Sequence, residues 1–256
     1  MTLNTNSTGG VTSAVLILGA TGGIGASLAR RLAATGASLF LVARREEPLI
    51  ALTEELSAHT SVQHAVGDAT DFAEIDRVAD RAREAFGTLT GVVNCVGSLL
   101  LKPAHLTKAE EFQAVIASNL TSAFGAVRSA ARVMPDGGSV VLCSSAAART
   151  GLANHEAIAA AKAGVLGLVL SAAATYGSRG LRVNAVAPGL VRTPMTARIT
   201  SSVAASEASR AMHALGRLGE PEDVSGVMAW LLGPDASWVT GQCFGVDGGL
   251  GTVRAK

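Results

Sequence analysis

Residues 15–25 read VLILGATGGIG, and the rest of the architecture follows from this junction. Four apolar residues suited to a buried strand run directly into a glycine cluster, and Ile24, Leu28 and Leu32 then recur at helical spacing. Such glycines permit a tight turn and let the backbone approach a pyrophosphate, which the free N–H groups of the next helix can bind. The junction predicts a strand, a dinucleotide-binding loop and a helix; the alternative is that the glycines serve only a tight turn.

Short apolar runs recur along the chain, at residues 39–42, 92–96, 140–143 and 183–187, with a weaker candidate at 62–66. Their continuous apolarity is typical of parallel strands covered on both faces. Helical patterns lie between them: one opens with a capping box from Thr107 to Glu110 and extends to about residue 134, one spans about 155–176 with Asn154 as N-cap, and one begins at Pro221. The alternation predicts an α/β fold, a single Rossmann-type, doubly wound parallel sheet with helices on both faces.

The chain has 256 residues, a length that suits one large α/β domain. We expect residues 1–11, which are polar, to form a flexible N-terminal tail, and residues 12–256 to form a single dinucleotide-binding and catalytic domain. Residues 192–218 form the one long irregular region, which makes them the natural candidate for a substrate lid.

The bulk composition argues against several classes of function. A formal net charge of +1, with no basic run longer than Arg44-Arg45, gives no reason to expect a nucleic-acid partner or an anionic membrane surface. The N-terminus lacks the features of a signal peptide and no apolar run reaches about 18 residues, so we expect a cytoplasmic protein without a membrane span. The five histidines show no metal-ligand spacing, and Cys95, Cys143 and Cys243 are expected to be buried free thiols, so no metal is expected.

The glycine spacing is G-x-x-x-G-x-G, and with it the sequence resembles the short-chain dehydrogenase/reductase family across about residues 12–250. Further motifs of that family follow in order: Asp68 in GDATD, Asn94 and Gly97 in NCVG, Asn119 in SNLTSAF, the pair Ser144-Ser145, Pro188-Gly189 in PGLVRT, and VDGG at 246–249. The resemblance implies a nicotinamide dinucleotide held by Gly19, Thr21, Gly22, Gly23, Ile24, Gly25, Asp68, Ala69, Asn94, Val96, Gly97, Lys162, Pro188, Gly189, Val191 and Thr193.

The end of the second predicted strand, Val42-Ala43-Arg44-Arg45, bears on the choice between NAD and NADP. An acidic residue there would bind the ribose 2′-hydroxyl of NAD, but none is present. Arg44, with Arg45 beside it, is placed to bind a 2′-phosphate through charge-assisted hydrogen bonds. We therefore expect NADP(H); the alternative is a solvated arginine pair that forms ion pairs with Glu46 or Glu47.

The resemblance also implies a catalytic group, of which Asn119, Ser145 and Lys162 are present. In the family, a tyrosine that lies 13 residues after the serine and four before the lysine transfers the proton, and both counts lead to Ile158. Tyr176, the only tyrosine, lies 18 residues beyond Ile158 on the same predicted helix, too far away to replace it. His155 shares a predicted helix face with positions 158 and 162 and is the candidate proton donor. Ser145, Lys162 and water are the other candidates, and His155 could instead cap the helix or line the pocket.

These features predict an NADP(H)-dependent oxidoreductase that transfers hydride to or from a small carbonyl/alcohol or imine/amine substrate, with a non-standard proton donor. An imine substrate would ease the loss of the tyrosine, since an iminium already carries its proton. The alternative is a cofactor-binding protein with little or no catalysis, acting as a sensor or a partner subunit. The resemblance further implies a homo-oligomer, a dimer or tetramer, formed through the two long helices predicted at about 107–134 and 155–176.

Overall fold

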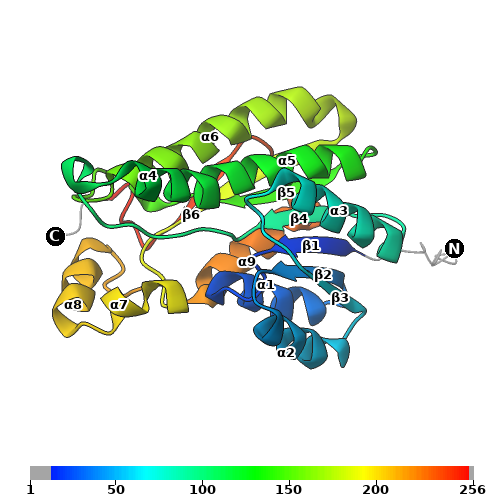
Figure 1. The fold of residues 1–256 in the computed structure, drawn as a ribbon, viewed down its shortest axis with the longest axis horizontal. Helices are drawn as coiled ribbons and strands as arrows, with labels where there is room; N and C mark the ends of the chain where they lie inside the picture. Colours follow the sequence, from blue (N-terminus) through cyan, green and yellow to red (C-terminus); the bar gives the residue numbers. More distant parts are fainter. Residues whose placement is uncertain (1–12, 254–256) are drawn as a thin grey trace, which may run out of the picture.

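The computed structural model describes residues 13–253 and contains a seven-stranded parallel sheet (Figure 1). The strand order is β3-β2-β1-β4-β5-β6-β7, so the chain builds outward from β1 to β3 and then crosses back to β4. The direction of winding reverses between β1 and β4, which makes the sheet doubly wound, as predicted. The strands are β1 (Ala14–Leu18), β2 (Ser38–Ala43), β3 (Val62–Val66), β4 (Gly91–Asn94), β5 (Gly138–Cys143), β6 (Leu181–Pro188) and β7 (Cys243–Val246).

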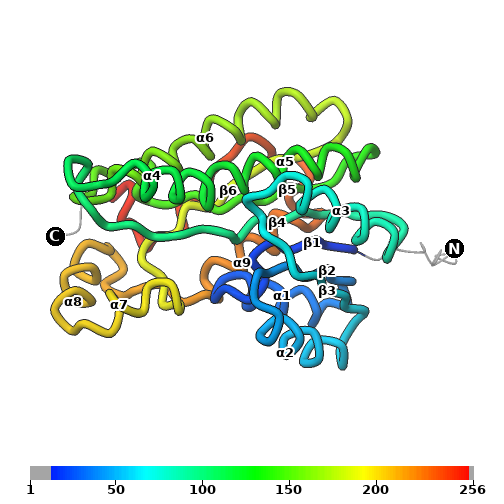
Figure 2. Tube along the Cα trace, in the orientation of Figure 1, coloured from blue at the N-terminus to red at the C-terminus, as the bar shows by residue number. Residues whose placement is uncertain are grey.

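Helices cover both faces of the sheet, as Figure 1 and Figure 2 show. One layer contains α1 (Gly23–Ala33), α2 (Glu46–Ser57) and α9 (Pro221–Leu232), and the other contains α3 (Phe72–Phe86), α4 (Ala109–Ile116), α5 (Ser122–Val133) and α6 (Glu156–Tyr176). In β1, Leu16 and Leu18 pack against the second layer, whereas Val15 and Ile17 pack against the first. Burial on both faces explains why the central strands β1, β2, β4, β5 and β6 read as largely apolar runs, whereas the edge strands β3 and β7 are mostly only partly buried.

The long helix predicted from residue 107 to about 134 is composite. It begins with α4 at Ala109, and the Glu111 carboxylate accepts a hydrogen bond from the Lys108 N–H at 2.8 Å. The predicted capping box from Thr107 to Glu110 is therefore wrong by one residue. A π-helical turn, η2 (Ala117–Thr121), separates α4 from α5, and turns of this kind are frequent at functional sites.

The predicted N-cap of α6 is also wrong. Asn154 adopts a left-handed conformation with φ 63°, which asparagine tolerates better than most residues, and His155 occupies the N-cap position without a capping bond from its side chain. The Asn154 carbonyl accepts a hydrogen bond from the Lys102 N–H at 2.8 Å. The turn before α6 is thus tied to the loop that follows β4.

Helix α6 is unusually apolar. A window within Glu156–Arg179 has a mean hydropathy of 1.8 and is long and apolar enough to cross a membrane by length and composition. A single helix of this kind is weak evidence for a membrane span, because a buried core helix meets the same criteria. Its buried residues Val165, Val169 and Ala172 belong to the core, and the helix packs against β5, β6, α4 and α5, which accounts for its apolar character.

Residues 192–218 are only partly irregular, contrary to the prediction. They contain a 3₁₀ turn, η5 (Pro194–Thr196), and two helices, α7 (Ala197–Thr200) and α8 (Val203–Met212), which lie beyond the carboxyl ends of the strands at the left of Figure 1. The predicted tail at residues 1–11 lies outside the described residues, and the domain boundaries remain a prediction.

Candidate active site

A cavity of about 680 Å³ opens at the carboxyl ends of β1, β2, β4, β5 and β6. Open parallel sheets bind their ligands at this edge, beside the point where the strand order reverses. The predicted catalytic residues Asn119, Ser145 and Lys162 line the cavity. So do most of the predicted cofactor residues, namely Gly19, Thr21, Gly22, Gly23, Ile24, Gly25, Arg44, Arg45, Asp68, Ala69, Val96, Gly97, Lys162, Pro188, Gly189, Val191 and Thr193.

Asn94 is the predicted cofactor residue that does not line the cavity. Its side chain is buried, where Nδ2 donates to the Ser122 hydroxyl at 3.0 Å and Oδ1 accepts from the Val96 N–H at 3.0 Å. The Asn94 side chain therefore holds the turn that places Val96 and Gly97 on the cavity wall, and its contact with the cofactor remains a prediction.

The glycine loop is packed too closely for larger side chains. Gly19 has φ +79°, and a Cβ there would lie 2.9 Å from the Val96 nitrogen. A Cβ at Gly25 would lie only 2.3 Å from the Gly19 oxygen. No side chain caps the N-terminus of α1, and its first turn contains no acidic residue. Its free N–H groups and positive dipole end therefore face the cavity, ready for an anion such as a pyrophosphate.

The far end of the cavity, at the ends of β2 and β3, combines two exposed arginines with a structured acidic loop. Arg44 and Arg45 line the cavity, and neither forms an ion pair with Glu46 or Glu47 within residues 13–253. The Asp68 carboxylate accepts from both the N–H and the hydroxyl of Thr70, each at 2.9 Å. This end therefore offers guanidinium donors for a phosphate beside a fixed carboxylate.

Asn119 lies in the π-helical turn η2 and is fixed in orientation. Its Nδ2 donates to the Val115 carbonyl at 2.9 Å and to the Ser98 hydroxyl at 3.1 Å, while its Oδ1 accepts from the Ser98 N–H at 3.3 Å. A Cβ on Gly97 would lie 2.9 Å from Asn119 Oδ1 and 3.5 Å from Lys162 Nζ. Asn119, Gly97 and Lys162 therefore meet in one corner of the cavity, where no larger side chain fits at position 97.

Lys162 is buried, with 6 % of its surface exposed. Its Nζ donates to the backbone oxygen of Cys143 at 2.7 Å, and no carboxylate pairs with it within the described part of the chain. Burial lowers the pKa of this amine, because desolvation disfavours the charged form. The lysine is therefore better suited to proton exchange than an exposed one.

Ser144 and Ser145 have different environments at the end of β5. The Ser144 hydroxyl donates to the Lys162 backbone oxygen at 2.9 Å and so ties β5 to α6. Ser145 is half-buried on the cavity wall, where its Oγ accepts from the Ala147 N–H at 3.2 Å. The hydrogen of the Ser145 hydroxyl is left free to donate to a ligand.

Ile158 lies one turn before Lys162 on α6 and also faces the cavity. It is 4 % exposed and forms a small apolar cluster with Val115, Ala157, Ala161, Leu100, Ile116 and Leu120. The wall at this position therefore offers packing and has no group that can carry a proton.

The structure does not bring His155 into the cavity. Its ring is not among the lining residues, and its Nδ1 lies 2.8 Å from the Ala153 oxygen. Because α6 begins at Glu156, His155 precedes the helix and does not share the predicted face with Ile158 and Lys162. Tyr176 lies at the opposite end of α6, with the Arg179 guanidinium 5.7 Å from its ring centre.

Several lining residues were not predicted from the sequence. Cys95 follows β4 and Cys143 ends β5, and burial raises the pKa of both thiols, so they are poor nucleophiles.

Within residues 13–253 no cluster of His, Cys, Asp and Glu has the arrangement of a metal site. Proximity to predicted residues is the signal that could have found the other unpredicted lining residues, namely Val42, Ala43, Gly67, Thr70, Ser98, Leu99 and Ser118. Five further lining residues lie at positions or in segments that the sequence had already singled out: Ser144, Ile158, Pro194, Met195 and Thr196.

Comparison with known proteins gives consistent matches over nearly the whole chain. A family model described as enoyl-(acyl carrier protein) reductase matches residues 19–251. The cis-4-hydroxycyclohexanecarboxylate dehydrogenase of Sinomonas cyclohexanicum is 37% identical, with 93% of this chain and 96% of that protein covered. The levodione reductase of Leifsonia aquatica is 34% identical, with 92% of each covered. The solved structure of a short-chain type dehydrogenase/reductase from Mycobacterium ulcerans matches with a TM-score of 0.91 at 34% identity, covering 95% of this chain and 91% of that one.

Proposed function

The chain belongs to the short-chain dehydrogenase/reductase family, and from this premise we propose that it is an NADP(H)-dependent oxidoreductase whose proton does not come from a tyrosine. The nicotinamide supplies or accepts the hydride when bound, and the protein positions the reacting groups. The observation that carries the proposal is one cavity lined both by the glycine loop at residues 19–25 and by Asn119, Ser145 and Lys162.

The preference for NADP(H) over NAD(H) rests on the end of β2. Arg44 and Arg45 follow that strand on the cavity wall, and no acidic residue is present there to bind a ribose 2′-hydroxyl. A guanidinium that is not already paired with a carboxylate is free to bind a 2′-phosphate through two parallel hydrogen bonds. We assign this role to Arg44, with Arg45 beside it.

The proton route is assigned to Lys162, acting through Ser145 or a water molecule. The Ser145 hydroxyl is free to donate to a substrate carbonyl oxygen, because its own acceptor site is used by Ala147. Lys162 can replace the proton, since burial lowers the pKa of its amine. His155 is the second candidate, but its ring would first have to turn from the Ala153 oxygen toward the cavity.

The substrate is proposed to be a small ketone or alcohol, or an imine or amine. Ile158, Leu99 and Met195 provide apolar lining at the catalytic end. An imine substrate would react in its protonated form, the iminium, since that form reaches the cavity with its proton already attached. The names of two relatives suggest cis-4-hydroxycyclohexanecarboxylate and levodione as the first compounds to try.

A parallel screen tests this function. NADPH and NADH consumption is measured with levodione, a series of cyclic ketones and the corresponding cyclic imines, and the reverse reaction is measured with the alcohols and amines. Turnover at ordinary enzymatic rates, on the order of 1 s⁻¹ or faster and greater with NADPH, supports the proposal. Turnover that is faster with NADH would contradict the cofactor assignment.

The alternative function is a cofactor-binding protein with little or no catalysis, acting as a sensor or a partner subunit. It is favoured by one observation, the apolar Ile158 on the wall beside Lys162, which leaves the proton without its usual carrier. Tight NADPH binding with no turnover on any compound in the screen would support it. Turnover of any one of them at ordinary enzymatic rates would exclude it.

We also propose that the protein is a cytoplasmic homo-oligomer, a dimer or tetramer formed through α5 and α6. Ala163, Gly167 and Leu170 are exposed on one face of α6, and Phe124 is exposed on α5. A Cβ on Gly167 would meet nothing within 4 Å, so a second helix has room to approach closely there. Light scattering after size-exclusion chromatography tests the oligomeric state, and a monomer would contradict the proposal. Cell fractionation tests the cytoplasmic location.

A further inference from the structure

Residues 193–212, here called the lid, form a segment whose two ends return to the same short loop. At its start, the Arg192 N–H donates to the Gly219 oxygen at 2.9 Å, and the Gly219 N–H donates to the Leu190 oxygen at 2.9 Å. At its end, the Leu190 N–H donates to Nε2 of His213 at 3.2 Å. Leu190, which precedes the lid, is therefore bonded to two residues that follow it: its carbonyl accepts from Gly219 and its N–H donates to His213.

His213 uses both of its ring nitrogens in this arrangement. Its Nδ1 lies 2.7 Å from the Ser209 oxygen in the last turn of α8, so Nδ1 carries the hydrogen and Nε2 is the acceptor for Leu190. The side chain is buried, with 3 % of its surface exposed. The imidazole thus joins lid helix α8 to the loop at residues 188–191.

That loop is also a wall of the cofactor cavity, through Pro188, Gly189 and Val191. The imidazole lies directly against it, because a Cβ on Gly189 would be 2.6 Å from His213 Nε2. Behind the wall is a second cavity of about 430 Å³, lined by His213 together with Gly189 and Leu190. With open space on both sides, the wall depends on contacts such as the His213 hydrogen bond to hold its position.

We propose that His213 is a positioning residue that couples cofactor binding to the closure of the lid. A cofactor seated against Gly189 and Val191 fixes the loop, the loop fixes His213 through the Leu190 N–H, and His213 fixes α8 through Ser209. The proposal rests on the proposed function only in requiring that the first cavity binds NADPH.

The test compares three variants. His213→Leu keeps the bulk but leaves the Leu190 N–H without an acceptor, whereas His213→Gln keeps an oxygen that can reach the position of Nε2. His59→Gln is the matched control, since His59 is exposed after α2, remote from the lid. NADPH affinity is measured by fluorescence, lid mobility by tryptic cleavage at Arg198 and Arg210 with and without NADPH, and kcat and KM by turnover.

In the wild type and in the His59→Gln and His213→Gln variants, we expect NADPH to slow cleavage of the lid by about tenfold. A factor of this size corresponds to roughly one net hydrogen bond. In His213→Leu we expect NADPH to bind within about threefold of wild type, lid cleavage to slow by less than about twofold, and substrate KM to rise more than kcat falls. Full NADPH protection of the lid in His213→Leu would overturn the proposal.

Hydrogen exchange on the wild type decides the matter if His213→Leu does not fold. NADPH should protect the Leu190 amide and the amides of α8 together, and protection of the Leu190 amide alone would overturn the coupling. A wild type that binds no NADPH contradicts both this proposal and the proposed function. Binding without protection of the lid contradicts this proposal alone.

Discussion

Lys162 donates a hydrogen bond from its buried Nζ to the backbone oxygen of Cys143, 2.7 Å away, and this contact is made without a carboxylate partner in residues 13–253. A carbonyl dipole compensates a buried ammonium only in part. The folded protein therefore favours the neutral amine, which is why the pKa of Lys162 lies below its ordinary value of 10.5.

This contact predicts a specific dependence of stability on pH. Below the folded-state pKa of Lys162, the amine is protonated in both states and the folded state bears the full cost of the buried charge. Between that pKa and about 10.5, the unfolded chain binds more protons than the folded one, so stability rises with pH. We predict that the free energy of unfolding of wild type, relative to Lys162→Met, increases as the pH rises toward about 10.5. Urea unfolding followed by circular dichroism measures it, and a flat or falling difference would contradict the assignment.

Arg44 is predicted to set the preference for NADP(H). Arg44→Ala should weaken NADPH binding by about 10- to 100-fold, the equivalent of losing one charge-assisted contact of about 1.5–3 kcal/mol. NADH has no 2′-phosphate and serves as the internal control, so its affinity should change by less than about twofold. Fluorescence titration with both cofactors is the measurement. Equal weakening of NADPH and NADH would show that Arg44 shapes the cavity without reading the phosphate.

Gly25 is predicted to tolerate no side chain. In Gly25→Ala the new Cβ would lie 2.3 Å from the Gly19 oxygen, so the loop must shift, at a cost of about 1–3 kcal/mol in stability. NADPH affinity should fall with it, because the shifted backbone no longer fits the pyrophosphate. Gly177→Ala, directly after α6, is the matched control: its backbone is helical with φ −59°, its Cβ meets nothing within 4 Å, and the variant should gain up to about 1 kcal/mol. Thermal unfolding distinguishes the two, and an unchanged Gly25→Ala would refute the close packing.

The sheet and the cofactor loop were predictable because their signals are local. The five central strands are buried on both faces and so read as apolar runs, whereas the edge strands β3 and β7 are mostly only partly buried and have a weak signal or none. The residues that line the cavity at the strand ends lie within a few positions of the apolar runs. The glycine loop is also determined locally, because neither Gly19 nor Gly25 has room for a Cβ. At Gly25 the obstacle is the Gly19 oxygen, and at Gly19 it is the Val96 nitrogen, just after the adjacent strand.

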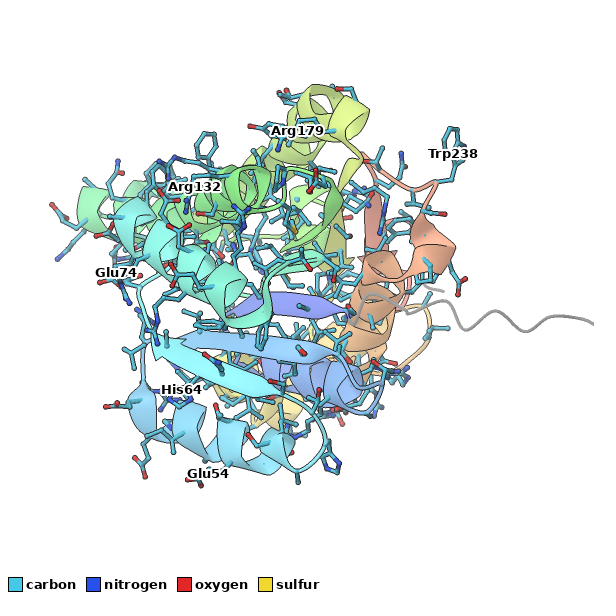
Figure 3. The ribbon with its side chains drawn as sticks, turned by 90° about the vertical axis from the view of Figure 1, so that its right-hand side faces the viewer. Glu54, His64, Glu74, Arg132, Arg179 and Trp238 are labelled. Carbon is cyan, nitrogen blue, oxygen red and sulfur yellow. The ribbon has the colours of Figure 1, made fainter. Side chains whose placement is uncertain are left out.

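The turn before α6 and the contact of His213 with Leu190 were not predictable, because they depend on residues that are distant in the chain. Asn154 adopts its left-handed conformation where its carbonyl bonds to Lys102, a partner 52 residues earlier in the chain, and this displaces the helix start by one residue. The role of His213 depends on Leu190, 23 residues away. The exposure of Trp238 was likewise not predictable from its neighbours in the sequence. Its side chain is 98 % exposed and projects from the surface (Figure 3).

Ser145 and His155 are predicted to respond differently to removal of their side chains. Ser145→Ala removes the hydroxyl that faces the cavity and should lower kcat by about 10²- to 10⁴-fold. His155→Ala should change kcat by less than about threefold, because the ring is bonded to the Ala153 oxygen and does not line the cavity. Steady-state rates on the best substrate of the screen provide the comparison. A loss of 10²-fold or more in His155→Ala would restore the histidine as the proton donor.

Ile158 provides the sharpest test of the site, because a tyrosine at this position would point its hydroxyl into a cavity that already contains Ser145 and Lys162. We predict that Ile158→Tyr raises ketone reduction by about 10²- to 10⁴-fold, the contribution of a positioned general acid. Ile158→Phe is the matched control: it brings the same ring into the cluster with Leu120 and causes the same crowding, without the hydroxyl. Reduction of a preformed iminium should not benefit from the tyrosine, since that substrate needs no proton. If Ile158→Tyr and Ile158→Phe reduce ketones at equal rates, the missing hydroxyl is not what limits this enzyme.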